Sequence, residues 1–213
     1  MAKFNYGGQA VIEGVMMRGQ YHSAIAVRKV DESISLLEEE VKMWSDSYPI
    51  LKKPIIRGAV ALVETMIMGI KSLNYSAIEY GEEEEQLTTK ELVLTMGFAI
   101  VLTVGLFIVL PAFLLRFIQA YISSNLVLNL VEGLIKISFF ILYILGISWM
   151  DDIKRVFAYH GAEHKTINCY EAGEELTVDN VAKHSRIHAR CGTNFLLIVL
   201  ITSIFVFSFF GRP

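Results

Sequence analysis

Hydrophobic residues gather in three long runs in the second half of the chain. Residues 92–122 carry a single charged side chain, residues 127–150 carry only Glu132 and Lys136, and residues 195–210 carry none. A helix needs about 20 apolar residues to cross a bilayer, so the first two runs predict membrane spans and the third predicts the start of another. We therefore expect a polytopic α-helical membrane protein.

The first fifty residues follow a different pattern, typical of short β-strands. Residues 23–30 and 33–40 are rich in strand-forming residues, and two acidic residues between them suit a hairpin connection. A short apolar stretch bracketed by glycines, residues 7–19, precedes them. The pattern predicts a small cytoplasmic, antiparallel, β-containing region at the N-terminus.

The next segment, residues 55–77, has helical composition with three charges among apolar residues. Three charges are costly in a membrane span, so we expect an interfacial or protein-covered amphipathic helix. The acidic run at residues 82–85 is typical of a solvated linker. The predicted organisation is therefore a β-rich region (1–53), an amphipathic helix with linker (54–90), two spans with an external hairpin (91–150), a cytoplasmic insert (151–194) and a third span (195–213).

Basic residues flank the spans on one side only, which orients the predicted topology. They are frequent before residue 92 and between residues 151 and 190, and absent from the loop between the first two spans. Positively charged segments stay inside, so the N-terminus and the insert are expected to face the cytoplasm. The first five residues contain no apolar run, so no cleaved signal peptide is predicted. The short third span at the chain's end suggests that the sequence is incomplete.

Charge and cysteine content narrow the possible partners. The net charge of −3 gives no basic surface of the kind that binds nucleic acid. Membrane lipids are expected to surround the predicted spans. The two cysteines lie in the predicted cytoplasmic insert and at its end, where a disulfide is disfavoured.

The segment from residue 159 to 193 concentrates the candidate chemistry. It holds four of the five histidines and both cysteines. On a helix, His160 and His164 lie one turn apart on the same face with Glu163 beside them, which is the His-x-x-Glu-His order of the inverted zinc-protease signature. We predict that the two histidines bind zinc or another divalent transition metal.

A catalytic zinc site keeps three protein ligands and an open position. The third ligand could be Glu171, His188 or Cys191. Glu163 is the candidate general base for a metal-bound water. Other readings remain open: the histidine pair could bind carboxylates or lipid phosphates, and the residues around Cys191 could simply form a helix-entry turn.

Two residues outside this core are also catalytic candidates. Arg190 is available as a substrate-binding group, and Glu13 could become a fourth ligand or a second acid/base group if its segment folds over the histidines. A buried structural carboxylate is an equally good interpretation of Glu13. His184, taken singly, is expected to be structural.

Three sequence blocks carry a resemblance to a known family: Gly8 to Gly19, Tyr159 to Lys165 and Ser185 to Thr193. They are similar to the signature blocks of the YqhQ family of bacterial and plastid membrane proteins. The resemblance implies a multi-pass protein of the bacterial inner (plasma) membrane and a predicted metal-dependent enzyme. It also implies a further span and a cytoplasmic tail beyond the present end. Ala189 departs from the proline that similar proteins commonly have there, which should loosen the turn before Arg190.

The leading hypothesis is a zinc-dependent hydrolase that acts on a lipid-linked or peptide substrate at the cytoplasmic membrane surface. A second is a non-enzymatic scaffold or accessory protein with a closed structural metal site. A third is a transport role through Glu132, Lys136 and Pro111, since polar residues inside a span often mark an ion path.

Overall fold

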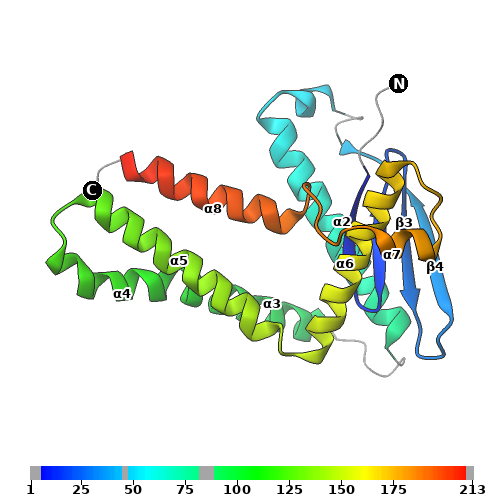
Figure 1. The fold of residues 1–213 in the computed structure, drawn as a ribbon, viewed down its shortest axis with the longest axis horizontal. Coiled ribbons are helices and arrows are strands. Elements are labelled where there is room, and N and C mark those ends of the chain that lie inside the picture. Colours follow the sequence, from blue (N-terminus) through cyan, green and yellow to red (C-terminus); the bar gives the residue numbers. More distant parts are fainter. Residues whose placement is uncertain (1–5, 45–47, 82–88, 210–213) are drawn as a thin grey trace. The chain divides into compact units, whose positions relative to one another are not determined.

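The computed structural model describes residues 6–44, 48–81 and 89–209, and it divides the chain into two units (Figure 1). The first unit combines residues up to 86 with residues 152–188, and the second combines residues 87–151 with residues from 189 onward. Three predictions fall outside the described residues: the absence of a signal peptide at residues 1–5, the acidic linker at 82–85, and the last residues of the third span.

The predicted antiparallel sheet is confirmed and has four strands in chain order. They are β1 (Gly7–Val11), β2 (Gly14–Arg18), β3 (His22–Arg28) and β4 (Ile34–Glu40). The β1–β2 turn is tight, and Glu13 adopts a left-handed backbone conformation there (φ 50°). A Cβ at Gly14 would lie 2.1 Å from the carbonyl oxygen of Ala26, so only glycine lets β2 begin so close to β3.

Helix α2 (Ile56–Tyr80) covers one face of the sheet. Met68 and Tyr75 pack against a small core of alternate strand residues, which are Val11, Met16, Ile25 and Val27. The buried Ser76 hydroxyl accepts a hydrogen bond from the backbone N–H of Ile12, 3.2 Å away. The amphipathic helix predicted for residues 55–77 is thus covered by protein on one side, and a short 3₁₀ turn, η1 (Pro49–Lys52), precedes it.

Helix α6 (Asp151–Ala172) meets the opposite face of the sheet, where a Cβ at Gly8 would lie 2.9 Å from its Glu163. Gly173 (φ +77°) ends the helix in the left-handed conformation that such ends require, and the chain turns back towards α7 (Val178–Lys183). The first unit therefore has three layers: α2 lies on one face of the sheet and α6 on the other (Figure 1).

The second unit is helical. Its elements are α3 (Thr89–Val104), the π-helical turn η3 (Gly105–Val109), α4 (Leu110–Ile118), the 3₁₀ turn η4 (Gln119–Tyr121), α5 (Asn125–Ile147) and α8 (Gly192–Phe209). Among the residues that the structure describes, two helices are long and apolar enough to cross a membrane, Val93–Tyr121 and Asn125–Ile147, and the apolar helix Gly192–Val206 is shorter. Most of their side chains are exposed, unlike those of a core helix in a soluble protein.

Two predicted features of these helices have a clear structural form. Pro111 cannot donate a backbone hydrogen bond, and the π-helical turn directly before it widens the helix where the ring would meet the preceding turn. Glu132 and Lys136 form the expected pair one turn apart, with 2.7 Å between Oε1 and Nζ. The connection between the two long helices is short, because η4 ends at Tyr121 and α5 begins at Asn125.

Helices α5 and α8 pack closely through a small residue. A Cβ at Gly133 would lie 2.6 to 2.7 Å from three side-chain carbons of Ile204. Small residues let helix backbones approach in this way, which is typical of helix pairs in membranes.

Candidate metal centre

Helix α6 presents the two central histidines together. The ring centroids of His160 and His164 are 4.2 Å apart, as one helical turn requires. His164 and Glu163 are buried, whereas His160 is half-buried. A third histidine, His188, is also buried, and its ring centroid lies 5.9 Å from that of His164. Three of the four histidines of the insert therefore lie close together in the first unit.

Hydrogen bonds fix which nitrogen of each ring carries the proton. His164 Nδ1 lies 2.7 Å from the carbonyl oxygen of Arg186, and a carbonyl can only accept, so Nδ1 is the donor and Nε2 carries the lone pair. His160 Nδ1 lies 3.2 Å from Glu163 Oε2, which gives the same tautomer when that carboxylate is ionised. Both imidazoles therefore offer Nε2, the form of ligand that a metal requires.

His188 is oriented by a carboxylate as well. Its Nε2 lies 3.3 Å from Glu171 Oε2, so the lone pair of the neutral ring is on Nδ1. Glu171 and His188 were both predicted as possible third ligands. In the structure, the Glu171 carboxylate pairs with the His188 ring.

Glu163 is held against the sheet by a glycine. A Cβ at Gly8 would lie 2.9 Å from both Cγ and Oε1 of Glu163 and 2.8 Å from the sulfur of Met17. Only a residue without a side chain allows this carboxylate so close to β1. The first and second sequence blocks therefore meet through Gly8 and Glu163.

Glu13 also reaches α6, but through different partners. Both carboxylate oxygens accept hydrogen bonds from the Arg155 guanidinium, and Tyr159 Oη donates a further one over 3.2 Å. Glu13 is buried, and the hydrogen bonds from Arg155 hold the pKa of its carboxyl below the usual value. Burial, followed by the charge of Glu13, raises the pKa of the Tyr159 hydroxyl. Both carboxylate oxygens of Glu13 thus already accept hydrogen bonds. The role of Glu13 as a metal ligand or acid/base group stays a prediction.

Sequence reasoning did not identify Arg155 and Tyr159. A signal was available, because Arg155, Tyr159 and Glu163 follow one another at intervals of four and so form one stripe along α6. Arg18, by contrast, is directed to the other side of the sheet, where Nη1 lies 3.4 Å from Thr65 Oγ1 of α2.

Arg190 and Cys191 belong to the second unit, next to the start of α8. The backbone N–H of Phe195 donates to the carbonyl oxygen of Cys191, which puts this cysteine at the helix entry. Their participation in the histidine site stays a prediction.

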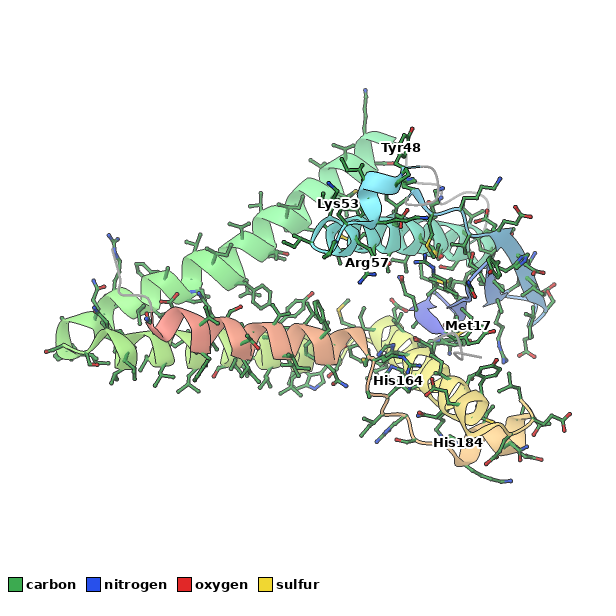
Figure 2. The ribbon with its side chains drawn as sticks, turned by 90° about the horizontal axis from the view of Figure 1, so that it is seen from above. Met17, Tyr48, Lys53, Arg57, His164 and His184 are labelled. Carbon is green, nitrogen blue, oxygen red and sulfur yellow. The ribbon has the colours of Figure 1, made fainter. Side chains whose placement is uncertain are left out.

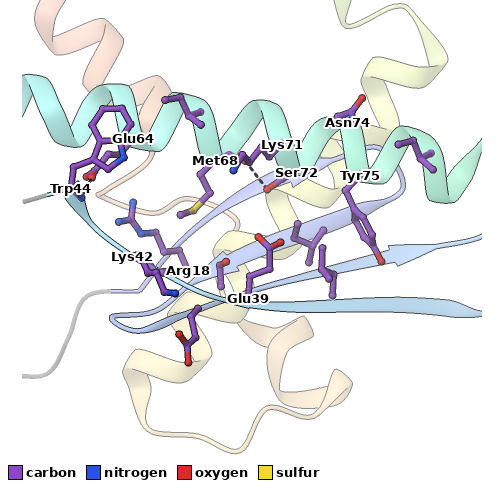
Figure 3. A pocket seen from close by; sticks show the side chains of 17 residues that line it. Arg18, Glu39, Lys42, Trp44, Glu64, Met68, Lys71, Ser72, Asn74 and Tyr75 are labelled. Atoms are coloured by element: carbon purple, nitrogen blue, oxygen red, sulfur yellow. Dashed lines mark hydrogen bonds between the residues drawn. The ribbon is translucent and has the colours of Figure 1, made fainter. Parts of the chain in front are cut away.

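A cavity of about 740 Å³ lies between the sheet and α2 (Figure 3). Its lining includes the charged residues Arg18, Glu39, Lys42, Glu64 and Lys71. It is on the α2 face of the sheet, whereas Gly8 and Glu163 meet on the α6 face. The cavity is therefore not part of the histidine site.

Comparisons with known proteins agree with the resemblance of the three blocks. The family model described as "Protein of unknown function (DUF1385)" matches residues 53–213. "Uncharacterized protein YqhQ" of Bacillus subtilis (strain 168) is 38% identical over 216 residues, which cover 95% of this chain and 68% of that protein. No solved structure matches the chain.

Proposed function

The chain belongs to the YqhQ (DUF1385) family of proteins of unknown function, and we propose that it is a zinc-dependent hydrolase at the cytoplasmic surface of the plasma membrane. The observation that supports this proposal most is the pair of imidazoles on α6. Each is held by its Nδ1, so that both present Nε2 lone pairs one helical turn apart.

The donor set suits zinc. Two neutral imidazoles with oriented second nitrogens are the usual basis of a catalytic zinc site. His188 is the preferred third ligand, because its ring is next to that of His164, and Glu171 then orients it. Bound zinc would supply a water that deprotonates near neutral pH and would polarise the bond to be broken.

The chain's own groups would then do the following work. Glu163 accepts at Oε2 the proton of the attacking water and passes it to the leaving group, while its hydrogen bond to His160 keeps that ring in place. Because Gly8 has no side chain, it leaves room for the other carboxylate oxygen, Oε1. Arg190 would bind a negatively charged part of a lipid-linked or peptide substrate.

The composition of the first unit supports the proposed location. Residues before and after the two long apolar helices fold into one body, so both segments must lie on the same side of a membrane that these helices cross. Two crossings satisfy this requirement. The basic residues in both segments favour the cytoplasmic side.

One observation favours a second candidate function, a structural metal site in a non-enzymatic accessory protein. Glu163, His164 and His188 are only 4%, 5% and 7% exposed, and a catalytic site needs room for water and substrate. A closed site would hold the metal without turnover.

The experiment is metal analysis of the purified membrane protein together with His160→Ala/His164→Ala. We expect the double variant to lose one equivalent of zinc. His22→Ala is the matched control, because His22 also lies near a carboxylate, 3.5 Å from Glu38, but on the exposed surface of the sheet. It should retain the metal. Unchanged metal content in the double variant would refute the assignment of these two ligands.

Activity separates the two candidate functions. Hydrolysis of p-nitrophenyl acetate and p-nitrophenyl phosphate is measured for protein in lipid vesicles. Glu163→Gln should keep its zinc but lose about 100-fold or more in rate, as expected for a general base. Wild-type protein that binds zinc yet is no faster than the double histidine variant on either ester would favour the structural site.

A further inference from the structure

We propose that the first unit contains a second metal site, formed by Cys169, Glu174 and His184 and suited to zinc. One ligand atom from each residue lies within 4.8 Å of the others. This site shares no residue with the histidine centre and does not depend on the hydrolase proposal. A thiolate, an imidazole and a carboxylate together are a ligand set that zinc accepts.

The end of α6 brings the three residues together. After Gly173, the backbone N–H of Glu174 donates to the carbonyl oxygen of Cys169 over 3.2 Å, so the chain folds back and Glu174 lies beside the cysteine. His184 caps the end of α7, where its own N–H donates to Val181. The ligands thus come from the last turn of one helix, the turn after it and the end of the next helix.

The distances suit a tetrahedral ion. His184 Nε2 and Glu174 Oε2 are 3.4 Å apart. Two ligands bound to zinc at about 2.0–2.1 Å in a tetrahedral site are separated by about 3.3–3.4 Å. The pair is therefore already spaced as neighbouring ligands of one ion, and Cys169 needs only a small side-chain adjustment to join them.

The His184 ring has an unexplained polar atom. Its Nε2 is buried and has no hydrogen-bond partner among the described residues, because its contact with Glu174 lacks hydrogen-bond geometry. A buried nitrogen without a partner costs about 1–3 kcal/mol in general. Cys169 beside it is fully buried, and its thiol donates a hydrogen bond to the carbonyl oxygen of Glu175 over 3.7 Å. A metal ion would give the His184 nitrogen a partner and would replace the weak thiol hydrogen bond with a metal–thiolate bond.

The site would anchor the segment that carries His188. From residue 184 the chain runs back along α6, held by Asn168 Nδ2, which donates to the carbonyl oxygens of Ser185 and Ile187 (2.8 and 3.1 Å), and by the His164–Arg186 bond. His184 is the start of this segment (Figure 2). A metal there would join residues 169–184 into a closed loop and so reduce the freedom of the segment.

The test uses this 213-residue chain with Cys191→Ser, in which Cys169 is the only remaining thiol. Cobalt(II) is the probe, since a cobalt–thiolate bond gives a charge-transfer absorption band that imidazole and carboxylate ligands do not give. We expect this band in Cys191→Ser and its loss when Cys169→Ser is added. His184→Ala should weaken cobalt binding by at least about tenfold, as removal of even an indirect ligand partner does.

Two controls separate this proposal from the hydrolase. His160→Ala/His164→Ala in the same background should keep the band, and His22→Ala should leave it unchanged. X-ray absorption at the metal provides a second readout that needs no change at Cys169: zinc-loaded Cys191→Ser should show about half a sulfur neighbour per zinc, because two sites are filled, and adding His160→Ala/His164→Ala should raise this to one. Absence of the band and of the sulfur neighbour in Cys191→Ser would overturn the proposal, as would a band that survives Cys169→Ser.

Discussion

The pair between Glu13 and Arg155 provides the sharpest test of how the sheet is attached to α6. Glu13 is only 5% exposed, whereas the Arg155 side chain is 58% exposed. Arg155→Met removes both guanidinium hydrogen bonds but keeps a long apolar side chain at the position. The buried carboxylate would then keep only its bond to Tyr159, so we expect the first unit to become less stable.

The magnitude follows from the burial of the two partners. Breaking a fully buried pair costs about 3–5 kcal/mol, but Arg155 is largely solvated and water screens its charge. Hydrogen bonds to charged groups contribute about 1.5–3 kcal/mol. We therefore expect a loss of about 2–3 kcal/mol in the free energy of opening, which is about a 30- to 150-fold change in the opening equilibrium.

The pH dependence distinguishes this effect from simple loss of packing. The pKa of Glu13 is lowered in the folded protein, so its stabilising contribution is present above the pKa of an unfolded glutamate, about 4.3. The contribution disappears as the pH falls through the lower folded value. The cost of Arg155→Met should therefore be full at neutral pH and vanish at acid pH.

Hydrogen–deuterium exchange of β1 and β2 peptides is the assay, because it reports opening of this unit within the intact protein. The double variant Glu13→Gln/Arg155→Met is the control, since a neutral amide should recover part of the loss. Lys154→Met is the matched surface change on the preceding residue and should have little effect. Exchange in Arg155→Met that matches wild type at neutral pH, or a cost independent of pH, would refute the reasoning.

Three further substitutions test individual contacts. Gly8→Ala puts a methyl group within 2.9 Å of Glu163, so we expect about 1–3 kcal/mol of destabilisation and weaker zinc binding in a metal titration. Gly133→Ala should separate α5 from α8 and lower the thermal midpoint in detergent; adding Ile204→Ala should restore it, and no recovery would contradict close packing there. Ser76→Ala leaves a backbone N–H at the β1–β2 turn without its acceptor, and a chemical denaturation curve should show about 1–3 kcal/mol lost.

Much of the fold was predictable from local patterns. Runs of strand-forming residues predicted β3 and β4, and the apolar runs predicted the two long helices, since both signals depend on neighbours within about twenty residues. The four-residue spacing of His160 and His164 likewise gave their common face on α6. These features need only local geometry.

The remaining features depend on contacts between distant parts of the chain. Glu13 and Arg155 are 142 residues apart, and nothing near either residue indicates the pairing. Gly8 matters only because a carboxylate from α6 approaches it. From the sequence, His184 was expected to have a structural role. It lies near Cys169 only because the chain turns back after Gly173, which the sequence pattern did not indicate.

The discontinuous first unit has a consequence for synthesis. At about 5–20 residues per second, a ribosome needs about 7–30 s to travel the 142 residues from Glu13 to Arg155. During that interval both long apolar helices emerge, while the β1–β2 hairpin has no α6 to cover it. One face of the sheet therefore stays uncovered until α6 is synthesised and packs against it, so the first unit cannot complete its folding before the intervening helices have been made.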